Sequence, residues 1–213
     1  MGTFKMKTLI EKTLKNAAEC SEKKNGEKIY LQDICVKNGY VMSTNSHILY
    51  KGRCNLLHSE GMVSKDNAKK GKPIFYSGIA RNYPDLDRVI PTDYKYIIKD
   101  ILVSDLLPAA EALKAFNKRR KAPLKLTIDP ENGFIYLSSF FDYGAEQIKV
   151  AQQAQISGPK QPYKIGIDPI LLVKALKGFE AIDSVDISFS ASNLQPLKIS
   201  NKEQLYIIAP CEL

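Results

Sequence analysis

The chain has 213 residues, 44% of them hydrophobic and 25% charged, and this ordinary globular composition excludes a wholly disordered chain, a collagen and a coiled-coil rod. Its 31 lysines and arginines against 23 aspartates and glutamates give a net charge of +8. No apolar run approaches the roughly 18 residues that span a bilayer, and the N-terminus has no secretory h-region, so we expect a cytoplasmic protein.

The cysteines and histidines do not form a metal-binding pattern. They contain no C-x-x-C pair and no zinc spacing, and they are Cys20, Cys35, Cys54, Cys211, His47 and His58. We therefore expect free thiols in a reducing compartment, no metal site and no cofactor.

The positive charge is concentrated in the first part of the sequence. Residues 1–91 hold 16 basic and 9 acidic residues, a net charge of +7, whereas residues 92–213 hold 15 and 14, a net charge of +1. Such a basic bias favours a polyanionic partner, of which nucleic acid is the usual one. The alternative is that the lysines only keep an ordinary protein soluble.

The first part of the chain is predicted to hold one helix and several strands. Apolar residues recur at helical spacing over residues 7–23, which predicts an amphipathic helix. Asn38-Gly39 predicts a hairpin turn. Residues 51–72 have poor periodicity and six basic residues, so we expect a basic loop with one short strand at most. Apolar runs predict strands at 29–31, 34–36, 40–42, 47–50 and 74–76. Residues 82–91 are predicted to form an ordered connection between domains.

The second part of the chain is more regular. Ser104 or Asp105 is predicted to cap a helix that runs to about residue 120, with Pro108 in its first turn. Asp168 is predicted to cap another helix that ends before Gly178. The apolar face of the earlier helix is predicted to be Leu106, Ala110, Leu113 and Phe116. Strands are predicted at 94–101, 124–129, 134–139, 145–151, 164–167, 184–190, 195–200 and 204–209.

The order of these elements over residues 92–213 repeats itself. A strand, a helix and three strands are followed by the same series again, which predicts an internal structural repeat. Partly alternating apolar residues indicate antiparallel strands. We therefore predict an α+β fold of repeated units, each with one helix packed on antiparallel sheet. Residues 1–91 are predicted to form a shortened domain of this kind and residues 92–213 a complete one.

A catalytic constellation is not visible in the sequence. There is no G-x-S-x-G, Walker A, H-E-x-x-H or Rossmann glycine pattern, so we expect that the protein is not an enzyme. Asp85 and Asp87 would point the same way in an extended segment and could share a cation in a metal-dependent nucleic-acid enzyme. The alternative is that both are acidic residues of an exposed loop.

Four segments carry a resemblance to a known family. They are residues 41–49, 83–91, 162–178 and 206–213. In this order they resemble the sliding clamp of bacterial replication, the β subunit of DNA polymerase III. That family has a T-D-G-H-R-L element, an F-P-D-Y-x-R-V-[IL]-P element, a Y-L-L-D-A-L element and a terminal Y-V-[IV]-M-P-M-R-L.

The resemblance implies a non-sequence-specific contact with duplex DNA. Clamps are rings of repeated units whose helices line the hole and present Lys and Arg to DNA phosphates, contacts that position a protein without reading sequence. The repetition of lysines on the polar faces of three predicted helices fits this role. The DNA-contacting residues would be Lys12, Lys15, Lys23, Lys114, Lys118, Arg119, Arg120, Lys121, Lys174 and Lys177.

The resemblance also implies a peptide-binding pocket between domains. A DNA polymerase, a clamp-loader-like protein or a repair protein would insert a short linear motif there. Carried over by motif, the pocket would be formed by Thr44, Ser46, His47, Ile48, Leu49, Pro84, Val89, Ile207, Ala209, Pro210 and Cys211. Leu31, on the preceding predicted strand, would join it. The expected function is thus a processivity factor of the sliding-clamp type. The alternative is a clamp-derived, peptide-binding adaptor or competitor that forms no ring and does not slide.

The chain departs from the family pattern at the pocket and in length. Asn45, Ser46 and Ile48 stand where the pattern has Asp, Gly and Arg. Ala209, Cys211 and Glu212 stand where it has Met, Met and Arg, so we expect an altered partner specificity. A ring of six such domains would require three copies of this chain, so a homo-oligomer is one expected possibility.

Overall fold

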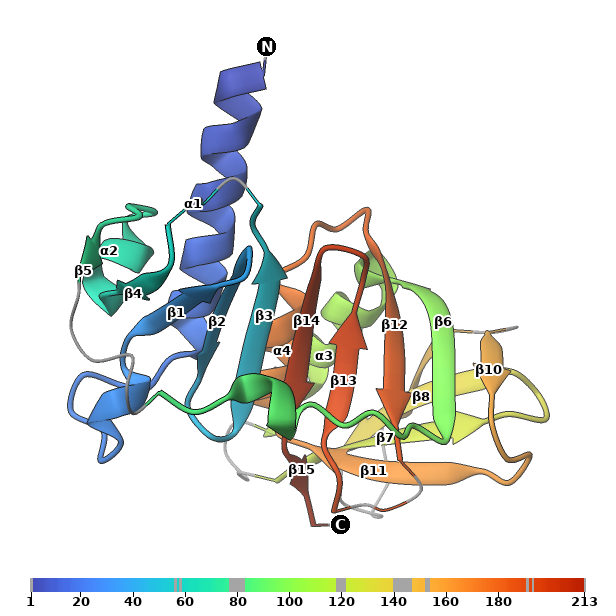
Figure 1. The fold of residues 1–213 in the computed structure, drawn as a ribbon. Helices are drawn as coiled ribbons and strands as arrows, with labels where there is room; N and C mark the ends of the chain where they lie inside the picture. The colour runs from blue at the N-terminus through green and yellow to red at the C-terminus, as the bar shows by residue number, and fades with distance from the viewer. Residues whose placement is uncertain are drawn as a thin grey trace. The chain divides into compact units, whose positions relative to one another are not determined.

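The computed structural model describes residues 2–55, 57, 59–76, 83–117, 122–139, 147–151, 154–190, 192 and 194–212, without the side chains of residues 2–7 and 151 (Figure 1). The chain forms two compact units. Unit 1 comprises Met1–Ile90 and Lys202–Tyr206, and unit 2 comprises Pro91–Asn201 and Ile207–Leu213. The predicted α+β class is confirmed, since each unit combines helices with antiparallel strands.

Unit 1 is built around one long helix and a small sheet. The elements of unit 1 before its C-terminal segment are α1 (Gly2–Cys20), η1 (Ile29–Leu31), β1 (Ile34–Lys37), β2 (Tyr40–Thr44), β3 (Ile48–Arg53), β4 (Gly61–Val63), α2 (Lys65–Lys69), β5 (Phe75–Tyr76) and η3 (Leu86–Val89). These strands follow the order β3-β2-β1-β4-β5, and their described pairings with one another are antiparallel.

The core of unit 1 lies between α1 and the strands β2 and β3. Leu14, Ala17 and Ala18 of the helix are fully buried, and the Ser43 hydroxyl donates a hydrogen bond of 2.6 Å to the Ala17 carbonyl. The hairpin turn between β1 and β2 is confirmed, because Asn38 and Gly39 both have a positive φ, 52° and 73°, as a type I′ turn requires.

Three sequence expectations for unit 1 were wrong. Residues 29–31 form a 3₁₀ turn rather than a strand, since three apolar residues fit either structure. Helix α1 ends at Cys20, so Lys23 lies beyond it. Residues 51–72 contain a helix, α2, as well as the short strand β4. Ser64 caps α2 by accepting from the Asn67 amide at 3.3 Å.

The end of α1 is held by α2. Lys65 is the first residue of α2, and its Nζ donates to the carbonyls of Ser21 and Glu22 at 2.9 and 2.7 Å. These carbonyls follow the last helical residue, where the backbone lacks intrahelical partners and the helix dipole favours a cation. Lys65, one of the six basic residues of residues 51–72, therefore has a structural role at the end of α1.

Unit 2 contains the predicted internal repeat. Its elements are β6 (Tyr96–Leu102), α3 (Val103–Asn117), β7 (Leu124–Asp129), β8 (Phe134–Ser139), β9 (Gln147–Ala151), β10 (Gln155–Ser157), β11 (Tyr163–Ile167), α4 (Pro169–Leu176), β12 (Ser184–Phe189), β13 (Leu197–Ser200) and β15 (Pro210–Cys211). Strand β14 (Gln204–Ile208) begins in unit 1 and ends in unit 2. The short strands β10 and β15 were not predicted.

The two halves of the repeat exchange their first strands. Strand β6 precedes α3 but pairs with β12 of the second half, and β11 precedes α4 but pairs with β7 of the first half. The five-stranded sheet of unit 2 has the order β15-β11-β7-β8-β9, and β11, β7 and β8 can be followed in Figure 1. Strands of both halves are thus paired with each other in each of these two places.

The helices of unit 2 pack against each other. Helix α4 follows the prediction: the Asp168 carboxylate accepts from the Ile170 and Leu171 amides, Pro169 is the first helical residue, and Gly178 follows the C-cap residue. Helix α3 begins at Val103, earlier than predicted, which places Pro108 inside it.

The early start of α3 has a long-range cause. The Val103 and Ser104 amides donate to the Asp183 and Ala181 carbonyls at 3.0 and 3.1 Å, so the first orphan amides of the helix are satisfied without a side-chain cap. None of the described helices is both long and apolar enough to cross a membrane.

Candidate functional site

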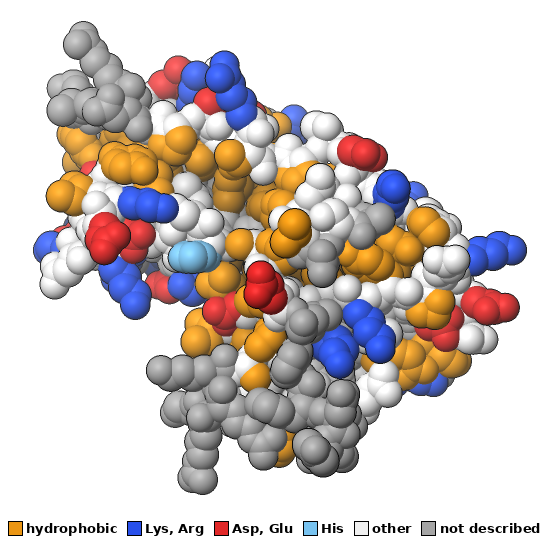
Figure 2. All heavy atoms as spheres, turned by 90° about the horizontal axis from the view of Figure 1, so that it is seen from below, with side chains coloured by type: hydrophobic (Ala, Val, Ile, Leu, Met, Phe, Trp, Pro, Cys, Tyr) orange, Lys and Arg blue, Asp and Glu red, His pale blue; other side chains and the backbone are white. Residues whose placement is uncertain are grey.

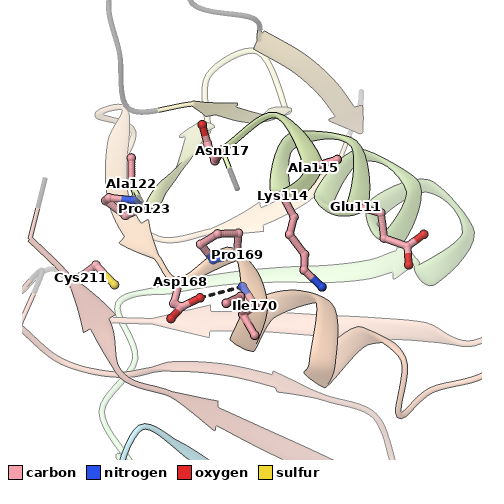
Figure 3. A pocket seen from close by; sticks show the side chains of 10 residues that line it. All are labelled: Glu111, Lys114, Ala115, Asn117, Ala122, Pro123, Asp168, Pro169, Ile170 and Cys211. Carbon is pink, nitrogen blue, oxygen red and sulfur yellow. Dashed lines mark hydrogen bonds between the residues drawn. The ribbon is translucent and has the colours of Figure 1, made fainter. Parts of the chain in front are cut away.

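A pocket of about 780 Å³ lies in unit 2 where α3, α4 and β15 meet (Figure 3). Figure 3 shows Lys114 extending from α3 toward the first turn of α4, with the Cys211 thiol on the opposite side. Most of the lining is apolar, as in a typical ligand pocket. The lining residues are Glu111, Lys114, Ala115, Asn117, Ala122, Pro123, Asp168, Pro169, Ile170 and Cys211.

Each wall of the pocket is fixed by local structure. The Asp168 cap, with a 2.7 Å hydrogen bond from the Ile170 amide, sets the first turn of α4 and presents the Ile170 side chain, which is 57% exposed. Strand β15 pairs with β11, with Cys211 opposite Gly166. This pairing holds Cys211 at the edge of the five-stranded sheet.

Asn117 is the unusual residue of the pocket. Its side chain is 2% exposed, and neither its amide nitrogen nor its oxygen has a hydrogen-bond partner among the described residues. A buried amide without partners costs roughly 1–3 kcal/mol. Asn117 follows Leu113 by four residues and thus continues the apolar face of α3, whereas Phe116, which was predicted to belong to that face, is 44% exposed.

The charges around the pocket are partly paired. The Lys177 ammonium contacts the Glu111 carboxylate at 2.8 Å and joins the end of α4 to α3. Lys114 has no ion-pair partner among the described residues. Burial raises the pKa of the Cys211 thiol, and the nearby Asp168 carboxylate raises it further. The thiol is therefore neutral at pH 7 and lines the pocket as a small apolar group.

The structure separates the predicted DNA-contacting residues into several environments. Lys12 and Lys15 lie on α1, and Lys23 lies in the exposed segment after it. Lys114 lies on α3, and Lys174 and Lys177 lie on or directly after α4. Residues 118–121, which account for the other four predicted contacts, lie outside the described residues.

Acidic residues accompany the helix lysines. Glu11 and Glu19 lie four residues before and after Lys15 on α1, a spacing that brings opposite charges together. Figure 2 shows basic and acidic side chains at several places, with hydrophobic side chains between them.

The residues predicted for peptide binding differ in exposure. In unit 1, Ser46, His47, Pro84 and Val89 are exposed, whereas Leu31, Thr44, Ile48 and Leu49 are buried. In unit 2, Ala209, Pro210 and Cys211 are half-buried, whereas Ile207 is buried. Of the unit 2 residues, Cys211 lines the pocket described above. The other lining residues of that pocket are not among those predicted for peptide binding.

The loop that joins β2 to β3 is held by side-chain hydrogen bonds. The Asn45 side-chain oxygen accepts from the His47 and Ile48 amides at 3.0 Å each, and the Thr44 hydroxyl donates to the Ile48 carbonyl at 2.9 Å. Ser46 has a φ of 76°, a left-handed conformation that glycine adopts most easily. This is the position where the clamp pattern has Gly.

Asp85 and Asp87 each pair with a basic residue. The Asp85 carboxylate caps η3 and pairs with Arg88 at 3.2 Å, and Asp87 pairs with Lys51 at 2.5 Å. No cluster of potential metal ligands occurs among the described residues. The carboxylates are thus committed to ion pairs, and the alternative of a shared cation is not favoured.

The fold is shared with solved sliding clamps. The chain is 18% identical to the DNA polymerase sliding clamp of Bacillus subtilis, with a TM-score of 0.80 over 97% of this chain and 63% of that one. For the DNA polymerase III β subunit of Borrelia burgdorferi the values are 17%, 0.78, 97% and 63%, and for the β subunit of Streptococcus pyogenes 17%, 0.77, 97% and 64%. No protein-family model and no curated protein sequence matches the chain.

These comparisons confirm the predicted resemblance at the level of the fold. The chain has the fold of bacterial DNA sliding clamps, with helix-and-sheet units of the same kind. It spans about 63% of the length of the clamps that it matches.

Proposed function

We propose that this chain is a non-enzymatic, sliding-clamp-like protein that contacts duplex DNA and recruits a replication or repair protein through a short linear motif. The match to the clamp fold over 97% of the chain carries the proposal. The net charge of +8 supports a polyanionic partner, and the pocket at the ends of α3 and α4 supports a peptide partner. The residues that resemble the clamp peptide site occur in both units.

Lysines of unit 2 would supply part of the DNA contact. Lys114 and Lys174 are half-buried on two helices that pack together, so their ammonium groups are presented by rigid elements. Phosphate contacts of this kind bind DNA without regard to sequence and release counterions. The affinity should therefore fall steeply with salt.

The DNA contact is tested by charge reversal on the helices. The variant Lys114→Glu/Lys174→Glu is compared with Lys160→Glu/Lys202→Glu, which reverses two exposed lysines outside the helices. Fluorescence anisotropy with a labelled duplex is measured over a salt series. Two lost phosphate contacts should lower the slope of log affinity against log salt by about 2. Equal slopes for the two double variants would reject the helix-lysine contact.

Ile170 is the residue of the pocket best suited to anchor a peptide. It is a large apolar side chain that is 57% exposed on the first turn of α4, and burying such a side chain contributes roughly 1.5–3 kcal/mol.

The peptide contact is tested with a fluorescent peptide that carries a bacterial clamp-binding motif. Ile170→Ala should weaken binding about tenfold, because about 1.4 kcal/mol of apolar burial is lost. Ile182→Ala is the matched control, since Ile182 is 89% exposed outside the pocket lining. Loss of binding in both variants, or in neither, would contradict the assignment of the pocket.

Retention on DNA separates the proposed function from its alternative. A clamp should stay on nicked circular DNA and leave after the circle is linearised, because sliding off requires a free end. An adaptor that does not slide would bind the motif peptide and show no difference between circular and linear DNA. Light scattering of the same sample would show whether three copies assemble.

A further inference from the structure

The five-stranded sheet of unit 2 has two different faces. Helix α3 packs against β8 and β9, and the side chains on that side, including Leu126, Ile135 and Leu137, are buried. The opposite face carries half-buried and exposed side chains, among them two aromatic rings and three lysines: Phe134, Tyr136, Lys125, Lys149 and Lys164. We call these five residues the aromatic-lysine face.

Strand register places these residues on one side of the sheet. Lys164 of β11 is opposite Thr127 of β7, Thr127 is opposite Tyr136 of β8, and Tyr136 is opposite Lys149 of β9. Residues directly opposite each other on paired strands share a face. The four residues thus form a row across the sheet, with a lysine at each end and a tyrosine inside.

A second aromatic ring lies beside this row. Phe134 precedes Tyr136 by two residues and therefore points to the same face. The two ring centroids are 6.0 Å apart with an interplanar angle of 80°. The Lys149 ammonium lies 3.7 Å from the centroid of Phe134 and 5.9 Å from that of Tyr136. The Lys149 ammonium therefore lies over the Phe134 ring, and both rings are half-buried on this face.

The charged side chains on the described part of this face are mostly basic. Lys125, Lys149 and Lys164 lie there with one described carboxylate, that of Asp129, which is opposite Phe134 in the register. The Asp129 carboxylate accepts hydrogen bonds from the Asn132 amide and side chain at 3.2 and 2.7 Å. These hydrogen bonds tie the Asp129 carboxylate to the loop between β7 and β8 and lower the pKa of Asp129.

We propose that the aromatic-lysine face binds single-stranded nucleic acid. Unstacked bases lie on aromatic rings while lysines contact the phosphates, and this combination is sequence-tolerant and sensitive to salt. The face of a multistranded sheet is too broad to enter a duplex groove, which admits a helix or a two-stranded ribbon. Paired bases also have no free faces for Phe134 and Tyr136. The partner that fits both the rings and the lysines is thus a single strand, and this site is separate from the helix lysines proposed for duplex DNA.

The proposal is tested by anisotropy with fluorescein-labelled oligothymidylate and with a duplex of the same length at low salt. Tyr136→Ala should weaken binding of the single strand by between about 5-fold and 150-fold, because one stacked base is lost. Tyr136→Phe is the matched control that keeps the ring, and its affinity should stay within about twofold of the parent chain. Lys149→Glu should lower the salt slope for the single strand by about 0.7.

The duplex arm and a competitor make the test decisive. Duplex affinity should be unchanged in Tyr136→Ala. The helix variant Lys114→Glu/Lys174→Glu should lose duplex affinity, but adding Tyr136→Ala to it should still weaken single-strand binding by the same factor as in the parent chain. Equal single-strand affinities of Tyr136→Ala and Tyr136→Phe would overturn the proposal. Polyglutamate that displaces the single strand equally well from the parent and Tyr136→Ala chains would also overturn it, because the face would then be a general anion site.

Discussion

The two units solve the same packing problem differently. In unit 2, α3 and α4 each follow the first strand of a half-repeat, pack against each other and are tied together by the Lys177–Glu111 ion pair. In unit 1, the partner of the 19-residue α1 is the five-residue α2. The difference shows that a five-residue helix is enough to satisfy the end of α1 in unit 1, whereas unit 2 packs two longer helices against each other.

The largest expected effect is that of a core cavity in either unit. Leu113→Ala in α3 and Leu14→Ala in α1 each remove a side chain that is at most 1% exposed, and each should cost about 2–5 kcal/mol. Hydrogen exchange should show the loss of protection mainly in unit 2 for Leu113→Ala and mainly in unit 1 for Leu14→Ala. An equal loss in both units for each variant would show that the units unfold together.

The contact between α2 and α1 predicts a smaller effect that is specific to unit 1. Lys65→Met keeps the aliphatic stem and removes the Nζ that donates to the Ser21 and Glu22 carbonyls. The loss of these charge-assisted bonds should cost about 2 kcal/mol in urea unfolding. Lys69→Met, an exposed lysine on the same helix, is the control and should change stability by less than about 0.5 kcal/mol.

Much of the fold was predictable where a local signal determines the structure. Asp168, Pro169 and Gly178 are start and stop residues of a helix, and α4 lies between them. Asn38-Gly39 is a hairpin signal, and both residues have positive φ. The order of elements in residues 92–213 was predictable as well, since it depends on many strands and on no single boundary.

The missed features depend on contacts between distant residues. The early start of α3 rests on the carbonyls of Ala181 and Asp183, which nothing near Val103 reveals. Helix α2 has no apolar periodicity, and its local signal was the Ser64 cap. In the candidate pocket, Asn117 could have been found from its place on the apolar face of α3, four residues after Leu113. The place of Ile170 in the pocket could not be predicted, because it depends on how α4 packs on α3.

The caps of the second helices allow the two units to be compared directly. Asp168→Ala removes the acceptor of the Ile170 and Leu171 amides in α4, and Ser64→Ala removes the acceptor of the Asn67 amide in α2. Each should cost about 1 kcal/mol. Asp168→Asn should retain most of the stability because an amide oxygen also caps. Thermal unfolding of the three variants would contradict this comparison if Asp168→Asn were as unstable as Asp168→Ala.

The smallest expected effect is a gain in unit 1, at the loop where the sequence departs from the clamp pattern. Ser46 has a φ of 76°, and a non-glycine residue there is strained by roughly 1–2 kcal/mol. Glycine avoids this strain, but it loses more backbone entropy on folding, which reduces its net gain in stability. Ser46→Gly should therefore stabilise the protein by about 0.5–1 kcal/mol, although it removes the 2.8 Å hydrogen bond from Lys28. Ser46→Ala loses the same bond and keeps the strain, so it should be slightly destabilising. If thermal unfolding gave equal midpoints for Ser46→Gly and Ser46→Ala, the left-handed conformation would not strain this loop, and the serine at the glycine position would carry no cost in stability.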